Sequence, residues 1–357
     1  MAPWLPLHVL LFLCAMLHGS SASGGDLLML DRFHAWMSAH GRSYPSDNEK
    51  LHRLEVYRRN VELIEATNME SGRLGYELGE NEFTDLTNEE FVARYTGAAV
   101  PKDDGDAISH GMGSIITTLA GDVNEGRARA STVDLNTSMF LATQNVDWRD
   151  QGAVTPAKRQ GTCGCCWAFA TVAAVESLIK IKGGKLMDLS VQELLDCDLS
   201  GQNGCKGGYI HLALQWVQAQ GGVVAEADYP YQELQGKCKT TDRARRVGKI
   251  TGYQPLRGEP MLKLAVFNRP VAIAMDATGV VMQNYKTGIY KGPCTTKQNH
   301  AVVLIGYGVS GTGEEYWIVK NSWGAGWGQN GFFYMRRGAD GAAGLCGMAE
   351  FGYSPNM

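Results

Sequence analysis

The sequence lacks several features that would assign it to a class at once. Its 33 basic and 37 acidic residues leave a net charge of only −4, which does not suggest a nucleic-acid partner. No apolar run reaches the roughly 20 residues that a membrane-spanning helix needs. Residues 24–141 contain no cysteine, although the whole chain has nine. We therefore expect neither a nucleic-acid-binding nor a membrane-spanning protein, and the uneven cysteine distribution indicates two parts of different character.

The N-terminus carries a short apolar run, residues 4–17, and small residues follow it at 21–23. This arrangement predicts a secretory signal peptide over residues 1–23. No Lys or Arg precedes the run, and a membrane helix is the alternative, but the run is too short for one. Apart from Cys14, all cysteines lie beyond residue 160, so in an oxidising compartment the C-terminal part should hold disulfides. Spacing alone leaves their pairing open.

Charge divides the chain near the same point. Residues 24–141 have 11 basic and 20 acidic residues, a net charge of −9, whereas residues 142–357 have 22 and 17, a net charge of +5. Two pieces of opposite charge can bind each other. Chance drift in surface charge is the alternative, which we consider weaker because the cysteine distribution changes near the same residue.

Periodicity indicates helices first and strands later. Residues 96–140, rich in Gly, Ala and Ser without a clear period, are typical of an exposed linker, and they contain a glycosylation sequon at Asn136. The patterns after residue 147 predict an α+β fold with a helical lobe and a sheet lobe. The expected helices are 26–40, 48–68, 168–182, 190–196 and 211–220, and the expected buried strands are 271–275, 300–305, 316–320 and 332–336.

The strongest chemical signal surrounds Cys166, at the start of an apolar helix. Gln160 lies six residues before this cysteine and His300 lies far downstream. A helix N-terminus and a histidine partner both favour the thiolate, the form in which cysteine acts as a nucleophile. The pattern therefore indicates covalent acyl-transfer chemistry.

Other interpretations of these residues are weaker. A metal cluster of Cys163, Cys165 and Cys166 lacks the usual two-residue gap between ligands. A redox pair of Cys165 and Cys166 would be a strained disulfide, because the two are adjacent. His300 taken alone fits a buried core histidine better than a catalytic one, so the assignment rests on the joint pattern.

With these residues, the chain resembles the papain-like cysteine proteases along nearly its whole length after the signal peptide. Residues 163–167 read Cys-Gly-Cys-Cys-Trp, and His300 and Asn321 follow Cys166 by 134 and 155 residues. Cys165 stands where the family commonly has Ser, although some plant members of the senescence-associated or vacuolar type share this sequence. Further matching segments are residues 147–149, 153–156, 299–301 and 320–328.

The resemblance implies a role for each of these residues. Cys166 would be the nucleophile, His300 would hold its proton and later deliver it to the leaving amine, and Asn321 would orient the His300 ring. Gln160 and the backbone N–H of Cys166 would form the oxyanion hole. Trp323 would cover the bond between His300 and Asn321.

The same resemblance implies the disulfides and the substrate cleft. Gly207 and Gly208 would let a peptide backbone come close and pair in extended form. An apolar S2 pocket would accept Leu, Phe, Tyr or Val at P2, and Arg poorly. The pocket would be lined by Tyr209, Ile210, Ala274, Ala301 and Phe351. The disulfides would be Cys163–Cys205, Cys197–Cys238 and Cys294–Cys346, leaving Cys165 and Cys166 free.

The acidic part would be an inhibitory prosegment over residues 24–141, helical over 26–95 with a linker over 96–141. A peptidase domain with a helical lobe and an antiparallel β-barrel-like lobe would follow over 142–357. The prosegment would cross the cleft in reversed direction, and acid would release it by neutralising its carboxylates. Two family propeptide motifs match, one at residues 79–85 and one at Glu49, Arg53, Tyr57, Asn60, Ile64 and Asn68.

We therefore expect the zymogen of a cysteine endopeptidase that uses no metal or organic cofactor. Its partners would be protein and peptide substrates, its own prosegment and cystatin-type inhibitors. It would act as a monomer in a vacuole, in a lysosome-like compartment or outside the cell. The alternatives are a catalytically silent binding or storage homologue, against which the complete set of site residues argues, and a transpeptidase.

Overall fold

The computed structural model describes residues 24–101, 145–239, 245–338 and 341–357. The expected signal peptide, the Asn136 sequon, most of the linker and the expected boundary near residue 142 lie outside these ranges. Two compact units divide the chain, one up to Arg59 and one from Asn60 onward. Within the described ranges, no helix is both long and apolar enough to cross a membrane.

The first unit contains α2 (Gly24–Ala39) and the first half of α3 (Asp47–Met69). Aromatic packing holds it together, since the buried Phe33 ring lies 5.2 Å from Tyr57 and 6.0 Å from Trp36. An ion pair of 2.7 Å joins Arg58 to Asp26. The helices expected at 26–40 and 48–68 are both present.

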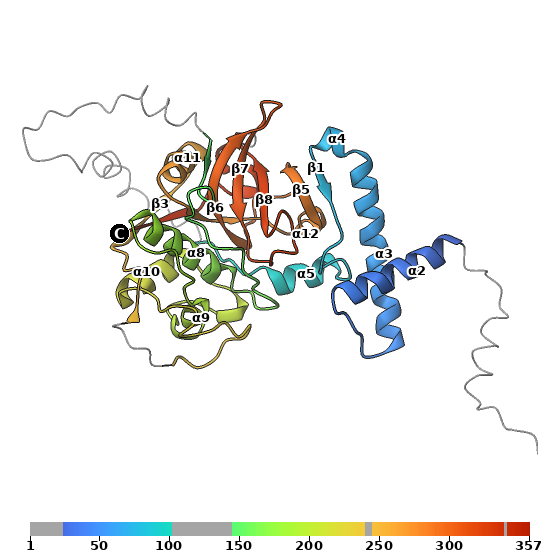
Figure 1. Ribbon diagram of the computed structural model, residues 1–357, viewed down its shortest axis with the longest axis horizontal. Helices are drawn as coiled ribbons and strands as arrows, with labels where there is room; N and C mark the ends of the chain where they lie inside the picture. Colours follow the sequence, from blue (N-terminus) through green and yellow to red (C-terminus); the bar gives the residue numbers. More distant parts are fainter. Residues whose placement is uncertain (1–23, 102–144, 240–244, 339–340) are drawn as a thin grey trace, which may run out of the picture. The chain divides into compact units, whose positions relative to one another are not determined.

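Three helices form the helical lobe of the second unit: α8 (Cys166–Ile181), α9 (Val191–Cys197) and α10 (Ile210–Gln220), green to yellow in Figure 1. Every residue of α8 from Cys166 to Leu178 is buried, as its uninterrupted apolar run predicts. The helix ends before Gly183, whose φ of 88° suits glycine. The expected helix at 168–182 is therefore confirmed, with a start two residues earlier, at the nucleophile candidate itself.

The other lobe is a nine-stranded sheet with the order β1-β5-β8-β7-β6-β4-β9-β3, and β2 pairs with β6. The expected two-lobed α+β fold is confirmed, but one strand pair departs from the expected antiparallel arrangement. Strand β5 runs parallel to β8, because the β6–β7–β8 meander returns β8 beside it in the same direction. The strands are β1 (Tyr76–Leu78), β2 (Val146–Asp147), β3 (Gly252–Leu256), β4 (Val271–Met275), β5 (Tyr285–Tyr290), β6 (His300–Val309), β7 (Glu315–Lys320), β8 (Phe332–Arg336) and β9 (Gly352–Asn356).

Strands β4 and β6 pack directly against α8. All five residues of β4 are buried, which explains its unbroken apolar sequence, typical of a strand covered on both faces. Strand β6 begins at His300, and its register pairs Ala301 with Ala274 of β4. This packing brings the N-terminus of α8 and the first residues of β6 to the same region.

The part of the prosegment that belongs to the second unit lies along the sheet lobe. Strand β1 pairs with β5, with Tyr76 opposite Gly288. The prosegment is thus not continuously helical over 26–95, because β1 and the turns up to Leu86 interrupt it. The remaining short elements are α4 (Ser71–Leu74), α5 (Asn88–Tyr95), α11 (Glu259–Asn268), α12 (Val280–Gln283), and the 3-10 turns Gly204–Lys206, Gly341–Ala343 and Leu345–Gly347.

Two amides from the expected propeptide motif stabilise these turns. Asn60 Nδ2 donates to the carbonyl oxygens of Thr84 and Leu86 at 2.8 and 3.1 Å. Asn68 bonds both the N–H and the C=O of Leu78. Asn68 uses both the donor and the acceptor of its carboxamide, and both residues of this motif support the backbone that follows α3.

Candidate active site

Cys166 is the first residue of α8 and is fully buried. A helix N-terminus favours an anion, but burial raises the pKa of the Cys166 thiol to about 12. Hydrogen bonding to the backbone of Ala301 and of Ala98 opposes this rise. Ala301 follows His300 directly, whereas Ala98 belongs to the prosegment. The thiol is therefore covered by both the opposite lobe and the prosegment, and it is protonated in this form.

His300 is also buried, and its Nε2 lies 2.8 Å from Oδ1 of Asn321. The same oxygen accepts a 2.8 Å hydrogen bond from the backbone N–H of Ser322, so Oδ1 acts as an acceptor and Nε2 must carry the ring proton. Nδ1 is left as a proton acceptor, and it has no hydrogen-bond partner among the described residues. Burial lowers the pKa of His300 to about 4, so the ring is neutral here.

Trp323 shields this pair. Its ring stacks on the His300 ring at 4.5 Å between centroids, and Trp327 meets it edge-on at 4.9 Å. Trp323 therefore covers one face of the His300 ring. A water-poor environment strengthens the bond between His300 and Asn321.

Gln160 is fully buried, and its carboxamide is fixed at both ends. Oε1 accepts a 2.7 Å bond from the Ser322 hydroxyl, while Nε2 donates to the carbonyl oxygens of Cys163 at 2.9 Å and Tyr95 at 3.3 Å. Trp323 Nε1 also donates to the Tyr95 oxygen, at 3.0 Å. A carbonyl oxygen of the prosegment thus accepts hydrogen bonds from both Gln160 and Trp323.

The prosegment crosses the cleft as an extended backbone. The N–H groups of Gly97 and Ala98 both donate to the carbonyl oxygen of Asn299 at 2.8 Å. Ala98 forms a parallel bridge with Gly208, with bonds of 2.8 and 2.9 Å. At Gly97 a Cβ would lie 2.1 Å from the carbonyl oxygen of Gly164. Only glycine fits this close approach, and the segment 96–99, expected as linker, is instead part of the cleft contact.

Some of the residues proposed for S2 share a buried apolar cluster with Ala98 of the prosegment. Ala98, Ile210 and Ala301 belong to one buried apolar cluster, with Phe351 packed against it. Ala274 donates its N–H to the carbonyl oxygen of Phe351 at 3.2 Å. Tyr209 is half-buried and precedes α10, and Gly207 precedes the pairing glycine Gly208.

The structure contains the three disulfides Cys163–Cys205, Cys197–Cys238 and Cys294–Cys346, and Cys165 and Cys166 are free. The Cys165 sulfur lies 3.1 Å from the hydroxyl of Tyr231, which also donates to the carbonyl oxygen of Gln160 at 2.6 Å. Burial raises the pKa of Cys165 to about 12. Over the described part of the chain, no group of His, Cys, Asp and Glu forms a metal site.

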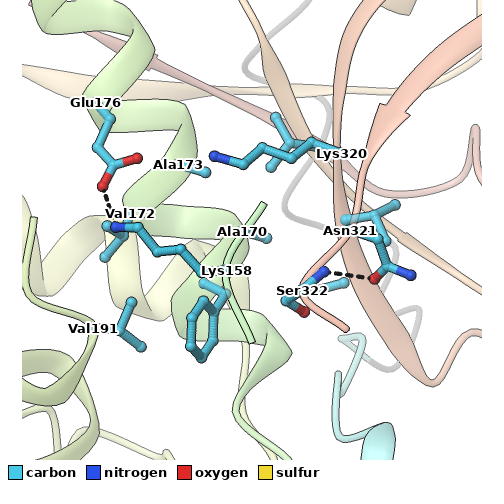
Figure 2. A pocket seen from close by; sticks show the side chains of 13 residues that line it. Lys158, Ala170, Val172, Ala173, Glu176, Val191, Lys320, Asn321 and Ser322 are labelled. Carbon is cyan, nitrogen blue, oxygen red and sulfur yellow. Dashed lines mark hydrogen bonds and ion pairs between the residues drawn. The ribbon is translucent and has the colours of Figure 1, made fainter. Parts of the chain in front are cut away.

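Beside Asn321 and Ser322 lies a buried polar chain that sequence reasoning missed. Lys320 Nζ donates to Thr155 Oγ1 at 2.6 Å, and that hydroxyl donates to Glu176 at 2.7 Å. Lys158 pairs with the same carboxylate at 2.7 Å. In Figure 2, Lys320 extends from the chain that carries Asn321 and Ser322 towards α8, which carries Glu176. In the sequence these polar residues stand out within apolar segments, but the sequence does not show which residues they bond.

The contacts of Ser322, Tyr95 and Arg159 were also not foreseen. Ser322 lies in the segment that gave Asn321 and Trp323, but nothing in a sequence shows that its hydroxyl reaches Gln160. Tyr95 acts through its backbone oxygen, which every residue type provides. Arg159 Nη2 forms a 2.7 Å ion pair with Glu82 of the prosegment.

The fold and site define a class: a two-lobed protein with a thiol at a helix N-terminus, a histidine at the start of a strand in the other lobe, and an N-terminal segment across the cleft. A family model for "Papain family cysteine protease" matches residues 142–356, and one for "Cathepsin propeptide inhibitor domain (I29)" matches residues 33–91. The chain belongs to the papain family of cysteine proteases. It is a cysteine endopeptidase with its inhibitory propeptide, that is, a zymogen.

Individual relatives agree with this family. Ananain from Ananas comosus is 42% identical over 95% of this chain and 92% of its own length. The senescence-specific cysteine protease SAG39 of Oryza sativa subsp. indica is 40% identical over 95% and 94%. Among solved structures, a recombinant stem bromelain precursor is similar with a TM-score of 0.78 and 40% identity, covering 92% of this chain and 99% of that one.

Proposed function

We propose that Cys166, His300 and Asn321 are the catalytic triad, that Gln160 is the oxyanion donor, and that the prosegment inhibits by filling the cleft in reversed direction. One observation carries the proposal. The Tyr95 carbonyl oxygen accepts a hydrogen bond from Gln160 Nε2, while Ala98 pairs with Gly208. The prosegment thereby uses both the polarising donor and the backbone edge that a peptide substrate needs.

The chemistry follows from these positions once the prosegment has left. Without that cover, the thiol proton of Cys166 moves to Nδ1 of His300, and the sulfur attacks the substrate carbonyl carbon. Gln160 Nε2 and the Cys166 N–H stabilise the oxyanion, each contributing about 2.7–4 kcal/mol. The imidazolium protonates the leaving amine as the C–N bond breaks. His300 then takes a proton from water, which attacks the thioester, releases the acid and restores the thiol.

The apolar surroundings of Ala98 support an S2 pocket for Leu, Phe, Tyr or Val. Phe351, beside it, carries no charge, so nothing at this position compensates a buried guanidinium at P2. The Arg257 guanidinium lies 5.0 Å from the Phe351 ring and adds a positive charge nearby. Arg at P2 should therefore be disfavoured.

In this proposal, acid activates the zymogen by protonating prosegment carboxylates, not by changing the protonation of Cys166 and His300. The closed form holds one proton on the sulfur, and the ion-pair form holds one proton on the imidazole, so opening transfers a proton without net uptake. The opposite charges of the two parts, −9 and +5, supply attraction that acid weakens. The Glu82–Arg159 pair is one ionic contact between the two parts.

Further expectations complete the proposal. These are a signal peptide over 1–23, a prosegment ending near 141 ahead of a peptidase domain over 142–357, and glycosylation at Asn136. We also propose a monomer in a vacuole, a lysosome-like compartment or the extracellular space, inhibited by cystatin-type proteins. This signal peptide would direct the chain into the secretory pathway, where the three disulfides can form.

The test is acid treatment of the purified zymogen at pH 4.5 and at pH 7, followed by N-terminal sequencing, titration with a thiol-protease epoxide inhibitor, and peptide kinetics. We expect conversion near residue 142 only at pH 4.5, one titrated site, and Phe or Leu preferred over Arg at P2. The Cys166→Ala zymogen is the control and should neither convert by itself nor bind the epoxide. Absence of titration would favour a silent homologue, and aminolysis products with an added amine would favour a transpeptidase.

A further inference from the structure

A charged cluster lies beside the oxyanion donor and has no part in the mechanism above. Arg159 Nε and Nη2 donate to the two oxygens of Glu82, the shortest bond being 2.7 Å. Nη1 lies 3.6 Å from Oε2 of Glu233. Glu82 belongs to the prosegment, whereas Arg159 and Glu233 belong to the enzyme. The prosegment carboxylate thus occupies one edge of a guanidinium that the enzyme holds from the other side.

The enzyme itself also contacts this guanidinium, through Glu233. Glu233 Oε1 accepts a 2.8 Å bond from the N–H of Thr162, which fixes the carboxylate. Gly161 leaves the room for it, since a Cβ there would lie 1.8 Å from the Glu233 carboxyl. In the zymogen the Nε–Nη2 edge of Arg159 faces the Glu82 carboxylate, an arrangement that suits bidentate binding.

The cluster lies on one definite side of the nucleophile. Arg159 forms an isolated antiparallel β-bridge with Trp323, and Gln160 is the next residue after Arg159. The prosegment passes from Glu82 and Tyr95 on this side to Ala98 at Gly208 on the other. Under the proposed function, on which this inference rests, the Gly208 side binds the acyl part of the substrate. Arg159 then faces the part that leaves with the amine.

We propose that Arg159 forms a leaving-group-side subsite that selects substrates with an acidic side chain. The ligand is a Glu or Asp carboxylate within the first three residues after the scissile bond, bound as Glu82 is bound in the zymogen. About half of the Arg159 side chain is exposed, so the contribution is that of a partly solvated ion pair, and we expect about a two- to fivefold preference.

Kinetics of the acid-processed enzyme test this. Internally quenched peptides share one P2 and P1 sequence and carry Glu, Gln or Lys at each of the three leaving-group positions. We expect kcat/KM for Glu to exceed Gln by about two- to fivefold at one position, and the difference to shrink in 0.5 M salt. Arg159→Gln should abolish the preference, and Arg159→Glu should favour Lys. Arg245→Gln, an exposed arginine paired with Asp228, is the matched control and should keep it.

The outcomes separate this inference from the function beneath it. Equal rates for Glu and Gln at all three positions, in an enzyme that cleaves the peptides, would overturn the subsite and leave the protease intact. A preference that survives in Arg159→Gln would do the same. No cleavage of any peptide, together with no epoxide titration, would overturn both.

Discussion

The hydroxyl of Ser322 donates a 2.7 Å hydrogen bond to Oε1 of Gln160. This bond decides which end of the carboxamide faces the cleft, because an oxygen acceptor at one end leaves the NH₂ at the other. Ser322 also donates its N–H to Asn321, so one residue orients both the oxyanion donor and the amide that fixes His300. Only the first of these bonds depends on the side chain.

Ser322→Ala should therefore lower kcat by about three- to tenfold, with KM little changed. The loss is smaller than the roughly 10²–10³ expected for Gln160→Ala, because Cys163 still holds Nε2 from the other end. Steady-state kinetics of acid-processed enzyme measure both. Ser354→Ala, a buried serine whose hydroxyl bonds Arg269 rather than Gln160, is the control. A Ser322→Ala enzyme with full kcat would show that Gln160 needs no such support.

The covered thiol makes a prediction about reactivity. Burial raises the pKa of the Cys166 thiol to about 12, so very little of it is thiolate at pH 7. Iodoacetamide should alkylate the intact zymogen at least 10²-fold more slowly than the processed enzyme. The zymogen rate should rise about tenfold per pH unit from 7 to 9, while the processed enzyme stays nearly flat. Using Cys165→Ser protein throughout removes the second thiol from the measurement.

Rapid, pH-independent alkylation of the zymogen would contradict this picture. It would mean that the ion pair of Cys166 and His300 persists beneath the prosegment. Mass spectrometry of the peptide that contains Cys166 distinguishes this from slow reaction elsewhere.

The sequence predicts the helices around Cys166 and the strands around His300 well because buried apolar runs determine both. Strands such as Gly252–Leu256 and Gly352–Asn356 were not predicted, because glycine and proline weaken their alternating pattern. These two strands are specified by pairing with each other. The side-chain roles at the site follow from motif residues. Contacts made by a backbone oxygen, as at Tyr95, or across lobes, as between Lys320 and Thr155, leave no mark in local sequence.

Gly97 allows a direct test of the prosegment contact. Gly97→Ala should weaken inhibition, because the added Cβ would lie 2.1 Å from the Gly164 carbonyl oxygen. This oxygen belongs to the backbone and cannot move aside as the end of a flexible side chain could. We expect Cys166 in this zymogen to react with iodoacetamide at least tenfold faster at pH 7 than in the unaltered zymogen. Gly72→Ala, where a Cβ meets nothing within 4 Å, is the matched control. Equal rates for the two variants would place the inhibitory contact elsewhere.

Lys320 offers a prediction about stability with a defined sign. Burial lowers its pKa to about 8, and its Nζ bonds Thr155. A lowered pKa means that the unfolded chain holds this proton more tightly. The folded state is therefore penalised when the pH falls below the ordinary lysine value of about 10.4, and the penalty is complete below about 8.

Lys320→Met removes that penalty together with one hydrogen bond worth about 1 kcal/mol. At pH 6 the variant should be more stable than the parent by roughly 1–2 kcal/mol, and the advantage should shrink by pH 9.5, where the parent lysine is largely neutral. Urea unfolding of zymogens with Cys165→Ser and Cys166→Ala, which prevent cleavage and thiol exchange, measures this difference. Lys185→Met, an exposed lysine, should shift neither value. Should Lys320→Met instead destabilise the fold at pH 6 by several kcal/mol, the charged amine would stabilise the folded state. The lowered pKa would then be the wrong description of its surroundings.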